Sequence, residues 1–154
     1  MINTQLLNPQ SIVVVGGSND TKKPGGKVLK NLLDGGFKGS IYVANQKETL
    51  VQGLNCYKNV GSLPPVDLAI LAIPAEFCLE TIEILASKKQ TKAFIILSAG
   101  FGEAEENGKQ LEKQIVAAVN SVGGCLIGPN CIGVLNQNYH GVFTTPIPQL
   151  DKNG

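Results

Sequence analysis

The segment 11–18 constrains the fold of this 154-residue chain more than any other. It reads Ser-Ile-Val-Val-Val-Gly-Gly-Ser, a run of β-branched residues that ends in two glycines. Such a run is typical of a strand that is buried on both faces, as in a parallel sheet. Gly16 and Gly17 allow the backbone to approach a ligand where a side chain would collide. Pro24 and Gly25 then precede a helix, whose unpaired N–H groups point at the same place. We therefore expect a strand, a phosphate-binding loop and a helix, with an anion such as a diphosphate at the loop.

The rest of the chain alternates between strand-like and helix-like patterns. Strands separated by helices require a parallel sheet with right-handed crossovers. We predict a Rossmann-like α/β fold of three layers, with a mainly parallel sheet and helices on both faces. The expected strands after the first are 40–44, 66–73, 93–97 and 125–127, with a short one near 141–144, and the expected helices are 27–34, 75–87 and 105–122.

The predicted domain spans residues 1–154, with the polar stretch 45–58 as a loop. The chain ends in Asp-Lys-Asn-Gly without a closing helix or strand. We therefore expect an N-terminal fragment of a longer enzyme.

Charge is distributed unevenly along the chain. Its 13 basic residues nearly balance its 12 acidic ones, but residues 1–60 hold seven lysines against three acidic residues. No lysine-rich run or aromatic platform for nucleic acid is present, so the basic half favours a phosphorylated small molecule. Every basic side chain except the one histidine is lysine, so phosphate would be held by backbone N–H groups and point charges rather than by guanidinium forks.

The cysteine and histidine content argues against a metal site. The four cysteines form no Cys-x-x-Cys pair, and His140 is the only histidine. No leader-like segment and no apolar run of about 18 residues is present. We expect a cytoplasmic protein with reduced thiols and no membrane partner.

The strand ends carry the candidate binding residues, because ligands of open parallel sheets bind at the carboxyl edge. A nicotinamide cofactor usually requires Gly-x-Gly-x-x-Gly and an acidic residue after the second strand. This chain has Gly-Gly-Ser-Asn-Asp-Thr from Gly16, and Asn-Gln-Lys at 45–47. NAD is disfavoured. Lys47 could hold a ribose phosphate, as in NADP or the 3′-phosphate of coenzyme A (CoA), or could be a solvated loop lysine.

Five segments together resemble a known family. They are 11–18, 35–43 (Gly-Gly-Phe-Lys-Gly-Ser-Ile-Tyr-Val), 66–75 (Val-Asp-Leu-Ala-Ile-Leu-Ala-Ile-Pro-Ala), 98–101 (Ser-Ala-Gly-Phe) and 128–133 (Gly-Pro-Asn-Cys-Ile-Gly). In this order they resemble the N-terminal CoA-binding domain of NDP-forming acyl-CoA synthetases, such as ADP-forming acetate–CoA ligases and, more distantly, the succinyl-CoA synthetase α subunit. The resemblance covers roughly residues 6–154.

The resemblance implies a function and a set of site residues. The parent enzyme would interconvert acyl-CoA, phosphate and NDP with acid, CoA and NTP, where the nucleotide is ADP or GDP. This domain would position CoA beside further synthetase domains, in the same chain or in a partner subunit, and would supply no catalytic residue. The expected CoA-binding residues are Gly16, Gly17, Ser18, Asn19, Gly25, Lys47, Ile73, Pro74, Ala75, Ser98, Ala99, Gly100 and Asn130.

Several expectations accompany this interpretation. A free-standing CoA-binding regulatory module and an NADP-binding reductase domain are the alternatives. His140 is expected to be an ordinary surface or interdomain residue, Cys131 a small residue that supports its loop, and Asp67 a hydrogen-bonded structural acid. A Gly17→Val change is expected to block the ligand without disturbing the fold.

Overall fold

A computed structural model describes residues 3–97, 106–128, 133–135 and 138–142. Its main feature is a seven-stranded sheet in the order β3-β4-β2-β1-β5-β6-β7. Neighbouring strands are parallel except β3 and β4, which form an antiparallel hairpin at one edge. The strands are β1 (Ser11–Val15), β2 (Ser40–Ala44), β3 (Leu50–Val51), β4 (Leu54–Tyr57), β5 (Leu68–Leu71), β6 (Ala93–Ile96) and β7 (Cys125–Ile127).

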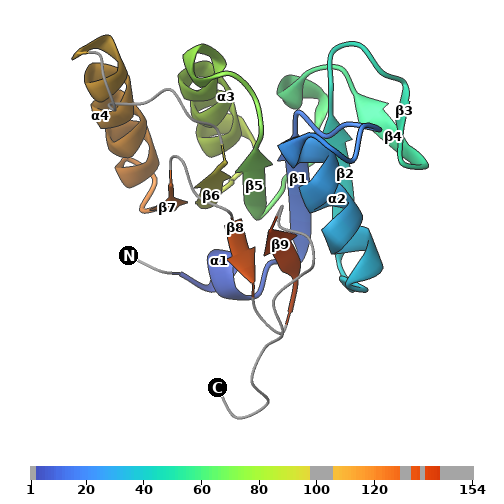
Figure 1. The fold of residues 1–154 in the computed structure, drawn as a ribbon. Coiled ribbons are helices and arrows are strands. Elements are labelled where there is room, and N and C mark those ends of the chain that lie inside the picture. The colour runs from blue at the N-terminus through green and yellow to red at the C-terminus, as the bar shows by residue number, and fades with distance from the viewer. Residues whose placement is uncertain (1–2, 98–105, 129–132, 136–137, 143–154) are drawn as a thin grey trace.

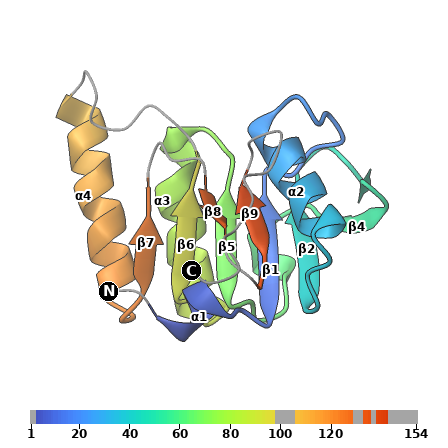
Figure 2. The same ribbon diagram turned by 60° about the horizontal axis from the view of Figure 1, so that its bottom comes forward.

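Helices cover both faces of this sheet (Figures 1 and 2). One face packs against α1, α2 and a second hairpin, β8–β9, and the other packs against α3, α4 and the short helix η1. The predicted Rossmann-like architecture is confirmed. The bounds are α1 (Thr4–Leu7), α2 (Pro24–Asp34), η1 (Val60–Ser62), α3 (Ala75–Lys88), α4 (Glu106–Asn120), β8 (Gly133–Leu135) and β9 (His140–Val142).

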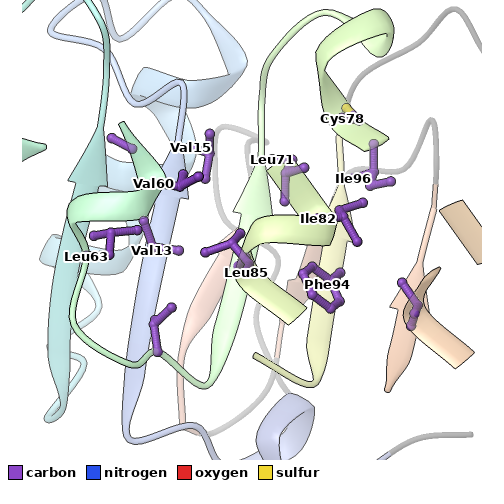
Figure 3. Packing of buried hydrophobic residues seen from close by; sticks show 14 of the residues in the cluster. Val13, Val15, Val60, Leu63, Leu71, Cys78, Ile82, Leu85, Phe94 and Ile96 are labelled. Carbon is purple, nitrogen blue, oxygen red and sulfur yellow. The ribbon is translucent and has the colours of Figure 1, made fainter. Parts of the chain in front are cut away.

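The β-branched run of β1 explains why the sheet is buried on both faces. Val13 and Val15 face the α3–α4 layer, whereas Ile12 and Val14 face α2. Figure 3 shows the first of these cores, in which Ile82 and other α3 side chains lie over β5 and β6. Each apolar side chain removed from water contributes about 1.5–3 kcal/mol, so a continuous apolar run is required in the central strand.

Several elements depart from the sequence-based expectations. The helix α2 begins at Pro24, so Gly25 lies in its first turn rather than in the preceding loop. The stretch 45–58 contains the β3–β4 hairpin, which was expected to be loop. Its turn residues Gln52 and Gly53 both have positive φ, the conformation of a two-residue hairpin turn. The strands β2 and β7 match their predicted bounds, while α1 and β8 were not predicted.

Three other expectations concern residues away from the strand ends. Asp67 accepts a hydrogen bond from the backbone N–H of Gln10 at 2.8 Å, which confirms its structural role. His140 is half-buried, and a Cβ atom on Gly35, just after α2, would lie 2.5 Å from its Nδ1. It therefore packs at the end of the sheet opposite the expected ligand edge. Cys131 lies outside the described residues.

The β8–β9 hairpin is held to the N-terminal segment by a buried hydrogen bond. The Tyr139 hydroxyl donates to the Leu6 carbonyl at 2.7 Å, and both residues are buried. Asn138 Nδ2 donates to the Leu7 carbonyl at 2.8 Å, one residue further along. These bonds join chain segments that are more than 130 residues apart.

We expect Tyr139→Phe to lower the free energy of unfolding by about 1–3 kcal/mol, because the Leu6 carbonyl would stay buried without its donor. Urea denaturation measures this change. Tyr57→Phe is the matched control, because the Tyr57 hydroxyl donates to none of the described residues, and it should change stability by less than about 0.5 kcal/mol. Equal losses in the two variants would contradict the assigned role of the Tyr139 bond.

Candidate functional site

The site lies where the sheet topology reverses. From β1 the chain passes through α2 to β2 on one side, and the later strands β5, β6 and β7 lie on the other side. The connection that leaves β1 leads to α2 on one face of the sheet, and the connection that leaves β5 leads to α3 on the opposite face. The two connections therefore diverge at the carboxyl ends of β1 and β5. Open α/β sheets bind ligands at such a point.

Gly16 forms a tight crossing at the end of β1. Its N–H donates to the Ala44 carbonyl at 2.8 Å, and its φ is +87°, a conformation that favours glycine. A Cβ atom here would collide with the Ala72 carbonyl oxygen. A Cβ atom on Gly25, in the first turn of α2, would collide with the Gly16 carbonyl oxygen. Both glycines therefore allow α2 and β5 to approach the end of β1.

Gly17 has a different role from the one that the sequence suggested. It is buried, and a Cβ atom on it would lie 2.7 Å from Cγ1 of Val43, inside the sheet. The expectation that Gly17→Val would block a ligand without disturbing the fold is therefore wrong. The absence of a side chain at this position serves packing against β2.

A cavity of about 560 Å³ opens beside this crossing, between the carboxyl ends of β1, β2 and β5, the segment before η1, and α3. Lys47 and Lys58 bring positive charge to its wall, and Glu80 of α3 brings negative charge. Phe77 is 52% exposed although it is aromatic, so its ring is available to a ligand. The other lining residues are Val15, Gly16, Ala44, Asn45, Gln46, Asn59, Val60, Ala72, Ile73, Pro74, Thr81 and Ile84.

A smaller hollow of about 100 Å³ extends the site across the sheet edge. Its walls are Pro24 at the start of α2, Leu97 after β6, and Ala72 and Ile73, which also line the larger cavity. The two hollows therefore share a wall over the end of β5. An elongated ligand could lie along this edge from the lysine-lined cavity to the end of β6.

The N-terminus of α2 adds an anion-binding element to the same edge. Its N-cap residue Lys23 makes no side-chain capping bond, and the first turn contains no acidic residue. The preceding N–H groups of Gly17, Ser18 and Asn19 donate to no other part of the described protein. Free N–H groups beside a helix N-terminus bind phosphate oxygens.

Asn45, the residue after β2, ties the glycine loop to the lysine segment. Its Nδ2 donates to the Gly17 carbonyl at 2.9 Å, and its Oδ1 accepts from the N–H groups of Lys47 at 2.8 Å and Glu48 at 3.2 Å. The Lys47 side chain itself is exposed. Its backbone position is thus fixed, while its ammonium group can move toward a ligand.

The structure brings most of the predicted site residues to one edge. Gly16, Lys47, Ile73 and Pro74 line the larger cavity. The remaining described ones lie beside it, in the glycine loop or in the first turns of α2 and α3; they are Gly17, Ser18, Asn19, Gly25 and Ala75. Ser98, Ala99, Gly100 and Asn130 lie outside the described residues.

Sequence reasoning missed Asn45 and the far wall of the cavity. Lys58, Asn59, Phe77 and Glu80 come from the segment after β4 and from α3. Phe77 falls within the predicted helix 75–87, and sequence periodicity does not distinguish a core position of a helix from a cavity wall. The position of Asn45 directly after a predicted strand was the available signal for that residue.

Two of the described cysteines, Cys56 and Cys78, are not activated nucleophiles. Burial raises the pKa of the Cys78 thiol to about 12, and burial is also the main cause that raises the pKa of Cys56. At neutral pH both remain protonated, and the thiolate is the reactive form. The described residues contain no group of three or more histidine, cysteine, aspartate or glutamate side chains suited to a metal. Within the same residues, no helix has the length and apolar character that crossing a bilayer requires.

Comparisons with known proteins show the family to which this chain is similar. Residues 10–137 match the model of a family described as CoA binding domain. The acetate–CoA ligase (ADP-forming) II subunit alpha of Pyrococcus furiosus is 43% identical over 90% of this chain and 31% of its own length. A 4-hydroxybutyrate–CoA ligase (ADP-forming) of Nitrosopumilus maritimus is 33% identical over 88% of this chain and 19% of its own length.

A solved structure shows the same fold. A dinucleotide forming acetyl-coenzyme A synthetase 1 of Candidatus Korarchaeum cryptofilum, in complex with phosphate and ADP, superposes with a TM-score of 0.86 at 34% identity. The match covers 97% of this chain and 32% of that one. The chain therefore spans about a third or less of the length of each of these relatives.

The packing of Gly17 predicts a stability change. Gly17→Ala should lower the free energy of unfolding by about 1–3 kcal/mol, because the new methyl group overlaps Val43. In a Val43→Ala background the same change should lower the free energy of unfolding by less, because the Cγ1 atom of Val43 is then absent. Chemical denaturation of the four proteins in this cycle measures the interaction. Additive losses would show that Val43 is not the obstacle.

Proposed function

The chain belongs to the CoA binding domain family, and we propose that it holds CoA along the carboxyl edge of its sheet. The observation that carries this proposal is the continuity of the edge. A lysine-lined cavity, a loop of free N–H groups at a helix N-terminus and a second hollow follow one another there. CoA has the matching order of a phosphorylated nucleoside, a diphosphate and a long pantetheine arm.

In this arrangement each part of the edge holds one part of the ligand. The loop 16–19 and the first turn of α2 bind the diphosphate through backbone N–H groups. Lys47 binds the adenosine 3′-phosphate, with Lys58 on the same cavity wall. Ile73 and Pro74 line the path of the nucleotide and the pantetheine arm, together with Ala75 and the segment 98–100. Asn130 completes the set of proposed contacts.

The polar residue after β2 favours CoA over a nicotinamide dinucleotide. NAD-binding folds place an acidic side chain here to accept hydrogen bonds from the ribose diol. Asn45 occupies this place instead, and both ends of its amide group are bonded within the protein. It therefore has no free acceptor of the kind that a ribose diol needs.

We further propose that the parent protein is an ADP- or GDP-forming acyl-CoA synthetase. It would interconvert acyl-CoA, phosphate and a nucleoside diphosphate with the acid, CoA and the triphosphate. The chain would be its N-terminal domain and would work with further domains of the same chain or of a partner subunit. The relatives that are named acid–CoA ligases are three to five times longer than this chain, which supports this proposal.

The domain would then contribute positioning rather than reacting groups. The Cys56 and Cys78 thiols are protonated, and His140 lies away from the ligand edge. Orientation alone can supply about 7–11 kcal/mol of a barrier reduction. The loop 16–19 and Lys47 would place the CoA thiol where the other domains deliver the acyl group.

Calorimetric titration of the chain with CoA, NADP and NAD tests the ligand. We expect measurable CoA binding and no binding of NAD or NADP at the same concentrations, because the segment from Gly16 lacks the Gly-x-Gly-x-x-Gly pattern of dinucleotide sites and Asn-Gln-Lys stands directly after β2 in place of an acidic residue. Adenosine diphosphate serves as a control for the shared nucleotide. NADP binding tighter than CoA binding would contradict the proposal.

A second test concerns Lys47. Lys47→Ala should lower the affinity for CoA several-fold, and at most about tenfold, at low salt. The effect is limited because an exposed charge-assisted contact is partly screened by solvent. Dephospho-CoA, which lacks the 3′-phosphate, should bind the variant as it binds the unchanged protein. Lys38→Ala is the control, since Lys38 precedes β2 at the opposite sheet edge. If Lys58→Ala rather than Lys47→Ala separates the two ligands, Lys58 is the phosphate contact.

A further inference from the structure

The hairpin β3–β4 lies against the glycine loop, although it belongs to the far edge of the sheet. Asn19 of the loop bonds the first strand and the turn of the hairpin: its Nδ2 donates to the Leu50 carbonyl of β3 at 3.0 Å, and its Oδ1 accepts from the Gln52 N–H in the turn at 2.7 Å. The loop and the hairpin are therefore joined at two points by one side chain.

The Gln52 side chain returns from the hairpin to the loop. Its amide Nε2 donates to the Ser18 carbonyl and to the Gly26 carbonyl, each at 2.9 Å. Ser18 belongs to the glycine loop and Gly26 to the first turn of α2. One amide group thus fixes the loop relative to the N-terminus of the helix.

The conformation of Gln52 is unusual for its residue type. Its φ is +48°, where glycine and asparagine are favoured and a longer side chain is strained. Strained backbone persists where the surrounding contacts hold it. The two bonds of the half-buried amide group are such contacts, and neither glycine nor asparagine at this position would make them with the same reach.

The direction of the Ser18 carbonyl determines the direction of a free donor. In a trans peptide the C=O of one residue and the N–H of the next point in opposite directions. Gln52 holds the Ser18 carbonyl, so it also sets the Asn19 N–H. Asn45 does the same for the Ser18 N–H through the Gly17 carbonyl. Neither N–H donates to another described residue.

We propose that Gln52 is a positioning residue for the diphosphate of the bound nucleotide. It acts through the loop: it holds the Ser18 carbonyl oxygen away from the phosphate oxygens, anchors the loop to the Gly26 carbonyl of α2, and so keeps the Asn19 N–H ready to donate. This inference rests on the proposed CoA site and adds a determinant from outside the cavity wall, since Gln52 does not line the cavity.

The variant Gln52→Gly tests this role, because glycine suits the positive φ and removes the side chain together with its amide group. We expect CoA and dephospho-CoA to bind about tenfold more weakly, since both contain the diphosphate and two hydrogen bonds are lost. Thermal unfolding should remain within a few degrees of the unchanged protein. Gly53→Asn is the matched control: it alters the same turn, tolerates positive φ and meets no atom within 4 Å.

Phosphorus NMR of bound CoA separates positioning from general stability. In Gln52→Gly the two diphosphate resonances should shift, while the 3′-phosphate resonance should stay in place. Unchanged affinity with unchanged diphosphate resonances would overturn the proposal, and so would an equal loss of affinity in Gly53→Asn. Absence of CoA binding by the unchanged protein would instead overturn the proposed function itself.

Discussion

The crossing of three backbone segments at Gly16 is the constraint on which the site depends. Here β1 and β5 end and α2 begins. The Ala72 carbonyl oxygen occupies the space that a side chain on Gly16 would need, and the Gly16 carbonyl oxygen occupies the space that a side chain on Gly25 would need. A Cβ atom at either position would separate the helix from the sheet. The close approach brings the N-terminus of α2 to the carboxyl edge, and it also gives the two hollows the shared wall of Ala72 and Ile73.

The second half of the site comes from the segment that follows β2. Asn45 and Gln52 donate to consecutive carbonyls of the glycine loop, so the loop conformation is determined by a part of the chain some 30 residues away. The hydrophobic core determines where the loop begins, through Val14 and Val15 of β1. The polar contacts determine which way its peptide groups point. The loop carries no charged side chain, but its N–H groups are held in fixed directions by these contacts and can therefore bind an anion.

The sequence predicted those strands that are determined by a local pattern of apolar residues. The β-branched run of β1 ends in glycines, which favours a buried strand, and the short apolar segments of β2 and β7 match their predicted bounds. The hairpin β3–β4 was missed because β3 has only two residues and its turn has Gln52 where asparagine or glycine would be the usual signal. The role of Gly17 was misjudged because its obstacle, Val43, comes from another strand. Tertiary contacts of this kind leave no periodic pattern in the sequence.

Backbone N–H groups and lysine side chains have different roles at the proposed site. The chain contains no arginine, and the lysines at the cavity are exposed, so their contacts are screened by salt and adjust to the ligand. The N–H groups of the glycine loop are uncharged and fixed in direction by their neighbouring carbonyl partners. Orientation of the proposed ligand therefore follows from the backbone, and discrimination between phosphorylated and unphosphorylated forms follows from the lysines. A domain organised in this way would orient the thiol of the proposed CoA ligand toward the other domains of the proposed synthetase.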